Sequence, residues 1–255
     1  MMNNSISLIM INLNRSQYLA EAIESVLKQT NDNWELIIVD DASSDGSLDI
    51  IKKYLNNNKI KLIVNNKHLG IVYSRIKAIE NSSSEIIGII DSDDVLDKEA
   101  VETMIERHNE NNNGLIYSQM MVCDKKLNQI SIGTNRQISQ ESSNLIQNCI
   151  SHFVTFKKSC YLKVGGYDRF FNRCSEDKDL FYKLEEVTEP LFVDKILYYY
   201  RMNPTSVSSY GFKKIIGRFL YFIAKFKAYQ RRRSTGSPKK IKLLELFPTK
   251  HSKKW

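Results

Sequence analysis

Residues 85–94 read Glu-Ile-Ile-Gly-Ile-Ile-Asp-Ser-Asp-Asp, an apolar run that ends in a cluster of carboxylates. The run is too short for a typical helix and lacks polar alternation, which predicts a strand buried on both faces. Three earlier runs of the same character predict strands at residues 5–11, 35–39 and 60–64. Apolar residues at helical spacing predict helices at residues 18–29, 47–55, 70–80 and 97–109, the last with Asp97 as its N-cap.

The alternation of strands and helices predicts βαβ units, and hence a parallel sheet with helices on its faces. Polar clusters follow three of the strands, at residues 12–15, 40–46 and 91–94. In sheets of this kind, ligands bind beyond the carboxyl ends of the strands. We therefore predict a ligand site where the three clusters converge.

The alternation weakens after residue 113. We expect the remaining elements to complete the sheet and to form a second wall of the cleft. They are a hairpin of strands at residues 115–122 and 129–132, a strand at 153–156, helices at 159–164 and 177–185, and a strand at 191–201.

The composition excludes several classes of protein. The chain has 255 residues, of which 42% are hydrophobic and only four are Cys, so disorder, collagen and small disulfide scaffolds do not describe it. No pair of Cys has the CxxC spacing, so we expect reduced thiols and a cytoplasmic location. The sequence shows neither the pattern of a signal peptide nor an apolar run long enough to span a bilayer.

Positive charge is concentrated in residues 210–255, which hold fourteen Lys and Arg and one acid, Glu245. These residues carry +13, so residues 1–209 carry −5 of the net +8. Residues 212–229 interleave apolar and basic side chains, as in a helix that lies on an anionic membrane surface. The alternative is a helix that packs back on the preceding domain. Nucleic acid is not expected as a partner, because no recognised binding module accompanies the charge.

The cluster Asp91-Ser92-Asp93-Asp94 predicts a site for a hard divalent cation. Closely spaced carboxylates repel one another unless a cation joins them, and Mg²⁺ or Mn²⁺ prefers oxygen ligands. The alternative is a solvated loop with a helix cap. After the second predicted strand, Asp40 and Asp41 either accept hydrogen bonds from a nucleobase or ribose, or belong to an ordinary turn.

Two further groups have both a functional and a structural interpretation. Arg75, in the predicted helix at residues 70–80, either clamps phosphate oxygens or forms a surface ion pair. Glu176 and Asp177 begin another predicted helix, where acidic residues are favoured as caps. One of these two carboxylates could instead act as a general base that accepts a proton from an attacking hydroxyl.

The order of these motifs resembles that of the family 2 glycosyltransferases, inverting enzymes with the GT-A fold. The resemblance covers roughly residues 5–209. It is carried by Ser7–Arg15, Tyr18–Thr30, Glu35–Gly46, Lys67–Lys77 with Arg75 in register, Asp91–Asp94, Gly165–Asp168 and Glu176–Leu180. It implies a Rossmann-like α/β fold: a mixed, mainly parallel sheet flanked by helices, followed here by a basic helical tail. Residues 1–113 would bind the nucleotide-sugar, residues 114–209 would supply the acceptor site and the base, and residues 210–255 would form the tail.

The resemblance also implies a role for each matched residue. Asp177 would be the catalytic base with Glu176 beside it, and Asp93 would bind the metal. The donor nucleotide site would comprise Asn12, Asn14, Asp40, Asp41, Arg75, Asp91 and Ser92. Many family members have, at the position of Asn203, a His that is often a metal ligand, so Asn203 would be a further ligand of the metal. Its carbonyl oxygen suits Mg²⁺ but is a weaker ligand than imidazole for Mn²⁺.

The predicted function is transfer of a sugar from a nucleotide diphosphate, with a UDP-sugar favoured, to a hydroxyl of a glycan or lipid-linked acceptor. The setting would be bacterial surface polysaccharide synthesis at the inner face of the plasma membrane. A nucleotidyltransferase is an alternative, although the glycine-rich phosphate loop expected after its first strand is missing from residues 12–15. A non-catalytic nucleotide-sugar-binding subunit is another, and Asp93 and Asp177 argue against it.

Overall fold

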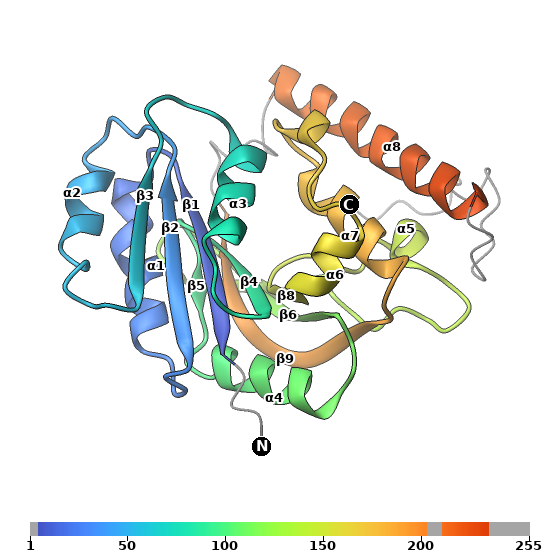
Figure 1. The fold of residues 1–255 in the computed structure, drawn as a ribbon, viewed down its shortest axis with the longest axis horizontal. Helices are drawn as coiled ribbons and strands as arrows, with labels where there is room; N and C mark the ends of the chain where they lie inside the picture. Colours follow the sequence, from blue (N-terminus) through green and yellow to red (C-terminus); the bar gives the residue numbers. More distant parts are fainter. Residues whose placement is uncertain (1–4, 203–210, 235–255) are drawn as a thin grey trace.

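A nine-stranded mixed sheet forms the centre of the molecule (Figure 1). The structure is a computed structural model that describes residues 5–202 and 211–234. The strands are β1 (Ile6–Asn12), β2 (Trp34–Asp40), β3 (Ile60–Val64), β4 (Ile86–Asp91), β5 (Val95–Leu96), β6 (Leu115–Cys123), β7 (Gln129–Ile132), β8 (Val154–Lys157) and β9 (Pro190–Arg201). The helices are α1 (Ser16–Leu27), α2 (Ser47–Lys52), α3 (Ile71–Glu80), α4 (Ala100–Glu110), α5 (Asn144–Gln147), α6 (Lys158–Lys163), the 3-10 helix η1 (Arg169–Phe171), α7 (Glu176–Glu185) and α8 (Gly211–Ser234).

The first half of the chain forms the predicted parallel sheet. The strand order is β3-β2-β1-β4-β8-β6-β9-β5, and β7 extends from β6. β1 pairs in parallel with both β2 and β4, and β2 pairs in parallel with β3. The register places Asn12 opposite Asp40 and Ile11 opposite Asp91. The polar residues after β1, β2 and β4 therefore lie at one edge of the sheet, as predicted.

The second half continues the same sheet with mixed directions. β8 pairs antiparallel with both β4 and β6, and β9 runs parallel to β6. β5 was not predicted, and it pairs antiparallel with β9. The prediction of Asp97 as a helix cap is wrong, because α4 begins at Ala100 after Glu99, and the Asp97 carboxylate accepts the Glu99 N–H at 2.9 Å. The division of the chain at residue 113 stays a prediction about function, since the sheet runs through both halves.

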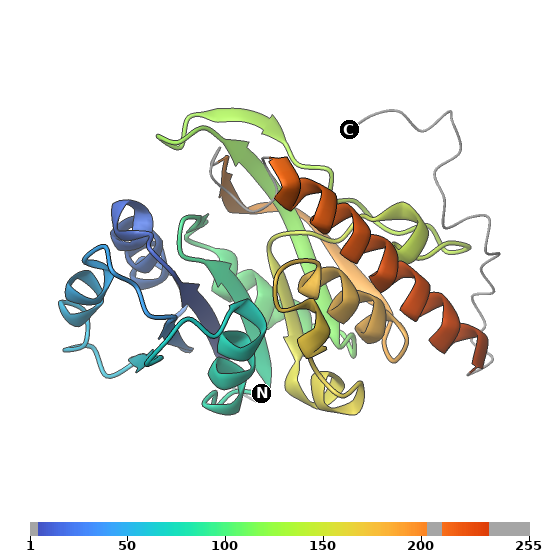
Figure 2. The ribbon, with the colours of Figure 1, turned by 90° about the horizontal axis from the view of Figure 1, so that it is seen from above.

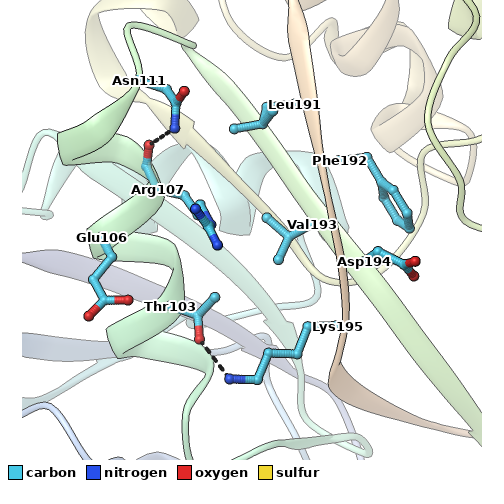
Figure 3. A pocket seen from close by; sticks show the side chains of 9 residues that line it. All are labelled: Thr103, Glu106, Arg107, Asn111, Leu191, Phe192, Val193, Asp194 and Lys195. Carbon is cyan, nitrogen blue, oxygen red and sulfur yellow. Dashed lines mark hydrogen bonds between the residues drawn. The ribbon is translucent and has the colours of Figure 1, made fainter.

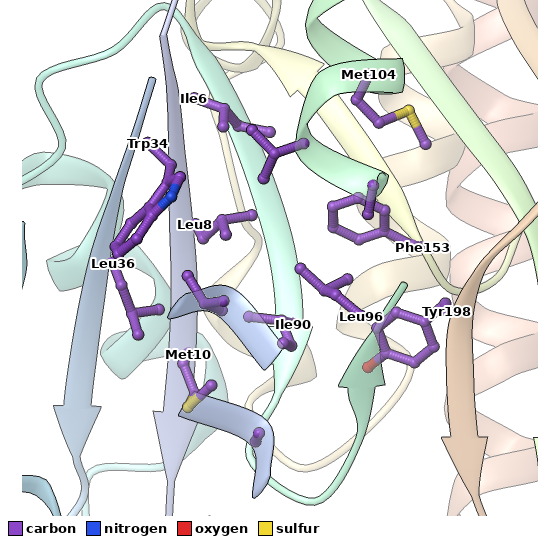
Figure 4. Close-up of a cluster of buried hydrophobic side chains, with 14 of the residues drawn as sticks. Ile6, Leu8, Met10, Trp34, Leu36, Ile90, Leu96, Met104, Phe153 and Tyr198 are labelled. Atoms are coloured by element: carbon purple, nitrogen blue, oxygen red, sulfur yellow. The ribbon is translucent and has the colours of Figure 1, made fainter. Parts of the chain in front are cut away.

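Each face of the sheet has its own apolar core. Side chains alternate between the faces of a strand, so Ile6, Leu8 and Met10 of β1 face one way and Ile9 faces the other. The first core, part of which Figure 4 shows, packs against α1, α2 and α4. The second packs against α3, α6 and α7. Burial on both faces explains why β1 and β2 are apolar at nearly every position.

Helix α8 lies along α7 on the outer side of the second half (Figures 1 and 2). Its inner face buries Leu220, Ala224 and Ala228 with Leu145 of α5 and Tyr182 of α7. Three of its basic residues also pair with acids of the preceding chain: Lys227 with Asp168 at 2.7 Å, Arg231 with Glu186 at 3.1 Å, and Arg232 with Glu185 at 2.8 Å. Packing against the preceding chain, the alternative to membrane binding, therefore accounts for the inner face of the helix.

Two sequence expectations concern features other than the sheet. All four cysteines are free, with Cys123 and Cys149 buried. Over residues 5–202 and 211–234, no helix has both the length and the apolar character needed to cross a bilayer. Residues 235–255 of the predicted tail, and Asn203, lie outside the described residues.

One lysine of α8 is buried without an acidic partner in the described part of the chain. Lys225 is 7% exposed, and its ammonium group lies 5.2 Å from the centre of the Tyr221 ring. Burial, and then the nearby charge of Lys178, lowers the pKa of Lys225. A buried charge without a counter-charge lowers the stability of the folded state.

We therefore expect Lys225→Met to stabilise the protein. The free energy of unfolding should rise by about 1 kcal/mol, which corresponds to a melting temperature higher by roughly 2–4 °C. Differential scanning calorimetry near neutral pH measures this shift. Lys195→Met is the control, because Lys195 forms an exposed ion pair with Glu99 and its loss should change little. A lower melting temperature for Lys225→Met would show that this ammonium group has a stabilising partner.

Candidate functional site

Arg75 joins two loops that are distant in the sequence. It lies on α3 with its side chain 7% exposed. Its guanidinium group contacts Glu176 Oε1 at 2.8 Å and Asp91 Oδ1 at 3.5 Å. The carboxyl end of β4 and the first turn of α7 are therefore held close together. The acidic loops at residues 91–94 and 176–177, to which the resemblance gives neighbouring roles, therefore converge.

The charges around Arg75 influence one another strongly. Burial alone would lower the pKa of Arg75, but Tyr167 and the carboxylates of Glu176 and Asp91 raise it above its usual value. Burial raises the pKa of Glu176 to about 7, while Arg75 opposes the rise and Asp177 adds to it. Glu176 is therefore held in the site by its ion pair, and its carboxylate points at Arg75.

Asp177 occupies a different environment from that of its neighbour Glu176. It is half-buried in the first turn of α7, and its Oδ1 accepts the Lys178 N–H at 2.8 Å. The turn is entered through Ser175, which has a φ of 66°. Its charge adds to the rise in the pKa of both Arg75 and Glu176, so it lies within the same group of charges. Of the two predicted catalytic carboxylates, Asp177 is the one that does not pair with Arg75.

Asp41 orders the loop that leads into α3. Its carboxylate accepts the N–H groups of Leu69 and Gly70 at 2.9 and 2.8 Å, and the Asn65 amide at 2.8 Å. Burial would raise the pKa of Asp41, but these hydrogen bonds hold it below its usual value. His68 Nδ1 also lies 2.8 Å from this carboxylate. Asp41 therefore contributes to the site by positioning the start of the helix that carries Arg75.

The start of α3 is also fixed from the second half of the chain. The Asn172 side chain accepts the Val72 N–H at 2.9 Å and donates to the Leu69 carbonyl at 2.7 Å. Gly70 has a φ of 95°, and a Cβ atom at this position would collide with the Asn172 amide. Glycine is therefore required at the point where the two halves of the site meet.

Asn12 and Asp40 form a buried pair at the ends of β1 and β2. The Asn12 amide donates to Asp40 Oδ2 at 2.8 Å and to Ser43 Oγ at 3.0 Å. The backbone N–H of Asn14 also donates to Ser43 Oγ, and the Asn14 side chain accepts the Ser44 N–H at 2.8 Å. These contacts tie the loop after β1 to the loop after β2 and give both a fixed shape.

The cluster at residues 91–94 contains two partly exposed and two buried side chains. Asp91 and Asp93 keep side-chain exposures of 33% and 18%, and Arg15 Nε lies 2.9 Å from Asp93 Oδ2. Asp94 and Ser92 are buried. Asp94 accepts the Tyr198 hydroxyl at 2.8 Å and the Arg201 N–H at 2.7 Å, so it fastens the loop to β9.

The donor set of Asp91 and Asp93 fits a divalent cation. Burial, and then the charge of Asp91, raises the pKa of Asp93, while Arg15 opposes the rise. Two partly exposed carboxylates that repel each other provide the oxygen ligands that such an ion prefers. Across residues 5–202 and 211–234, no group of three or more His, Cys, Asp and Glu side chains is arranged to hold a metal. An ion held by Asp91 and Asp93 would therefore need further ligands from residues of other types, from residues outside these ranges, or from substrate and water.

Sequence reasoning did not assign His152 to the site. Its Nδ1 lies 3.8 Å from Asp91 Oδ2, and its ring stacks on Tyr198 and Tyr200 at 5.2 and 5.4 Å. A lone histidine between two strands gives no spacing signal, so only the fold reveals this contact. Arg15 was missed as an ion-pair partner of Asp93 for the same reason.

Neither of two cavities in the described part of the molecule includes Asp91, Asp93, Glu176 or Asp177. One, of about 580 Å³, lies between α4 and the start of β9 (Figure 3). It is lined by Thr103, Glu106, Arg107, Asn111 and residues 191–195. The other is lined by residues around Tyr161–Arg169. The contacts around Arg75, rather than either cavity, therefore define the candidate site.

Comparison with known proteins identifies the class of fold and then the family. The structure superimposes on S. aureus TarS solved with UDP-GlcNAc with a TM-score of 0.69 and 19% identity, covering 94% of this chain and 76% of that one. A mannosyltransferase of Pyrobaculum calidifontis, solved with GDP-Man and Mn²⁺, gives a TM-score of 0.66 at 11% identity, covering 92% of this chain and 76% of that one. These likenesses establish the GT-A fold. The family model described as Glycosyl transferase family 2 matches residues 7–165, and the chain belongs to this family.

The curated relatives include enzymes of polysaccharide and lipid-linked sugar synthesis. An Escherichia coli chondroitin synthase is 29% identical over 72% of this chain. The E. coli enzyme WfgD, described as a UDP-Glc:alpha-D-GlcNAc-diphosphoundecaprenol beta-1,3-glucosyltransferase, is 34% identical over 44% of it. This chain spans 27% of the chondroitin synthase and 44% of WfgD, so it corresponds to only part of each.

Proposed function

We propose that this glycosyltransferase moves a sugar from a nucleotide diphosphate donor to a hydroxyl of a lipid-linked glycan, with inversion at the anomeric carbon. The observation that carries the proposal is the contact of Arg75 with both Asp91 and Glu176. Through this contact, Arg75 would hold the predicted base, Asp177, beside the predicted donor site. The nucleotide-sugar bound by TarS and the acceptor named for WfgD support the two substrate classes.

The donor would bind along the carboxyl edge of the sheet. Asn12, Asn14, Asp40 and Asp41 shape the loops that would surround the nucleoside, and Asp91 with Ser92 would lie on its ribose side. A Mn²⁺ or Mg²⁺ ion held by Asp93, with Asp91 beside it and the predicted Asn203 as a further ligand, would neutralise charge on the departing diphosphate. Arg75 would add positive charge on the same side.

Asp177 would act as the general base. Its carboxylate would accept the proton of the acceptor hydroxyl as the oxygen attacks the anomeric carbon opposite the diphosphate. A single displacement of this kind inverts the configuration. Glu176 would act through Arg75 as a positioning residue, because its carboxylate already pairs with that guanidinium at 2.8 Å.

A thermal-shift experiment tests the donor site and the metal together. UDP-GlcNAc with Mn²⁺ is expected to raise the melting temperature of the full chain by several degrees, because it binds only the folded state. Most of this shift should disappear with EDTA, or in Asp93→Ala with Mn²⁺ present. The control is Asp194→Ala, an exposed carboxylate that lines the remote cavity. A shift of equal size with EDTA and in Asp93→Ala would contradict the metal role.

A further inference from the structure

Helix α8 presents a second apolar surface, on the side away from the protein. Ile215, Phe219 and Phe226 are 64%, 64% and 48% exposed, and Phe222 between them is 41% exposed. Spacings of four, three and four residues place these side chains in one line, because a helix turns about 100° per residue. The buried residues Leu220, Ala224 and Ala228 lie on the opposite side. We call the four exposed side chains the outer row.

Basic residues flank the outer row. Lys227, Arg231 and Arg232 contact acids of the preceding chain, whereas Arg218 and Arg233 are exposed. The sequence of α8 contains no acidic residue. Residues 235–255, which follow it, contain six Lys and one Glu. The apolar row therefore lies within a strongly positive part of the chain.

The size and charge of this surface favour a lipid bilayer over a second copy of the protein as its binding partner. The outer row spans eleven residue steps, or about 16 Å of helix, and is one side chain wide. A strip of this kind covers much less area than the roughly 800 Å² that each partner buries in a stable protein interface. A second copy would also bring the same positive charge, +13 over residues 210–255, against the first. A bilayer with anionic headgroups satisfies both features, because apolar side chains enter the acyl boundary while arginines meet the phosphates.

We propose that α8 docks on an anionic phospholipid bilayer through Ile215, Phe219 and Phe226, with Arg218 and Arg233 at the headgroups. The inner face of α8 packs on α7, whose first turn carries Asp177. Docking would therefore hold α7 near the surface in which a lipid-linked acceptor lies. The docking surface goes beyond the transfer reaction, and it can be tested without turnover.

Co-sedimentation of the full chain with lipid vesicles tests this surface. We expect binding to vesicles of phosphatidylcholine with phosphatidylglycerol and much weaker binding to phosphatidylcholine alone. Phe219→Ser/Phe226→Ser should lower the partition coefficient at least tenfold. Arg218→Ser and Arg233→Ser should each lower it by roughly fivefold at low salt. The matched control is Ile130→Ser/Ile132→Ser on β7, whose side chains are 54% and 62% exposed and lie far from α8 in the sequence.

Three results would overturn the docking surface. One is wild-type protein that stays in the supernatant with both kinds of vesicle. Another is unchanged binding by the double Phe variant while its melting temperature matches that of the wild type. The third is a lipid-free dimer in sedimentation velocity that the double Phe variant abolishes, since this would assign the outer row to a second copy. Vesicle binding by a protein that shows no donor-dependent thermal shift would remove the proposed function and leave the docking surface intact.

Discussion

Asp177→Asn is expected to lower the rate of sugar transfer by at least about 100-fold while leaving donor binding nearly unchanged. An amide cannot accept the proton of the acceptor hydroxyl, so the step that needs a base is lost. Its carbonyl oxygen can still accept the Lys178 N–H, which now donates to Asp177 at 2.8 Å, so the start of α7 should persist. Product formation from a UDP-sugar, measured beside the donor-dependent thermal shift, separates catalysis from binding.

Asp194→Asn provides the matched control for this carboxylate-to-amide change, because Asp194 is exposed and remote from the site. It should transfer sugar at the wild-type rate. Wild-type turnover by Asp177→Asn would exclude Asp177 as the base. A loss of the donor-dependent shift in the same variant would instead indicate that Asp177 supports the donor site.

Arg75→Met is expected to reduce both stability and transfer. Removing this side chain leaves Glu176, whose side chain is 11% exposed, without its ion-pair partner. Loss of one partner from a buried pair lowers the free energy of unfolding by about 3 kcal/mol, or roughly 6–12 °C in melting temperature. Chemical denaturation at several pH values measures this change.

The stability lost by Arg75→Met should increase with pH. The folded-state pKa of Glu176, about 7, is above its ordinary value of 4.5, so the folded protein holds this proton more tightly than the unfolded chain does. The stability that Glu176 contributes by binding this proton is therefore complete below pH 4.5, and it is lost as the pH rises through the folded-state pKa. Without Arg75 the folded pKa rises further, so the loss extends to higher pH. We expect a small difference from wild type near about pH 5 and a large one near about pH 8.

The double variant Arg75→Met/Glu176→Gln separates this ion pair from other effects of the substitution. Neither side chain is charged, so its stability should return toward the wild-type value and depend less on pH. A double variant as unstable as Arg75→Met would indicate that Arg75 stabilises the fold through Asp91 or Tyr167 instead.

The elements that sequence reasoning located best are those with a strong local signal. β3 and β7 have the predicted bounds, and β1, β2 and β4 differ from the predicted strands by one residue at each end. The apolar runs of β1, β2 and β4 end in polar clusters, so both length and position can be inferred. β5 was missed because two residues have no periodicity, and its partner β9 follows about a hundred residues later. The length of α2 was overestimated, since Leu55 fits the helical pattern but lies 39% exposed beyond the last turn.

The candidate site was predicted as a set of loops rather than as a set of contacts. The convergence of the loops after β1, β2 and β4 follows from strand direction, and a place for residues 176–177 beside them was implied by the resemblance in motif order. Three contacts could not be inferred from the sequence. They are the pairing of Arg75 with Glu176, the hydrogen bonds of Asp41 to the loop at residues 65–70, and the approach of His152 to Asp91. Each of these contacts depends on side-chain directions across elements that are distant in the chain, and no local pattern encodes them. The assignment of donor, metal and base roles stays a prediction.

The position of β8 between β4 and β6 matters for the order in which the nascent chain can fold. β4 ends at Asp91, but its second neighbour in the sheet does not begin until Val154. While the intervening residues are synthesised, one side of β4 has free backbone groups beside an apolar surface, the kind of edge that pairs with other chains. More than sixty further residues must therefore be synthesised after β4 before β8 can pair with its free edge.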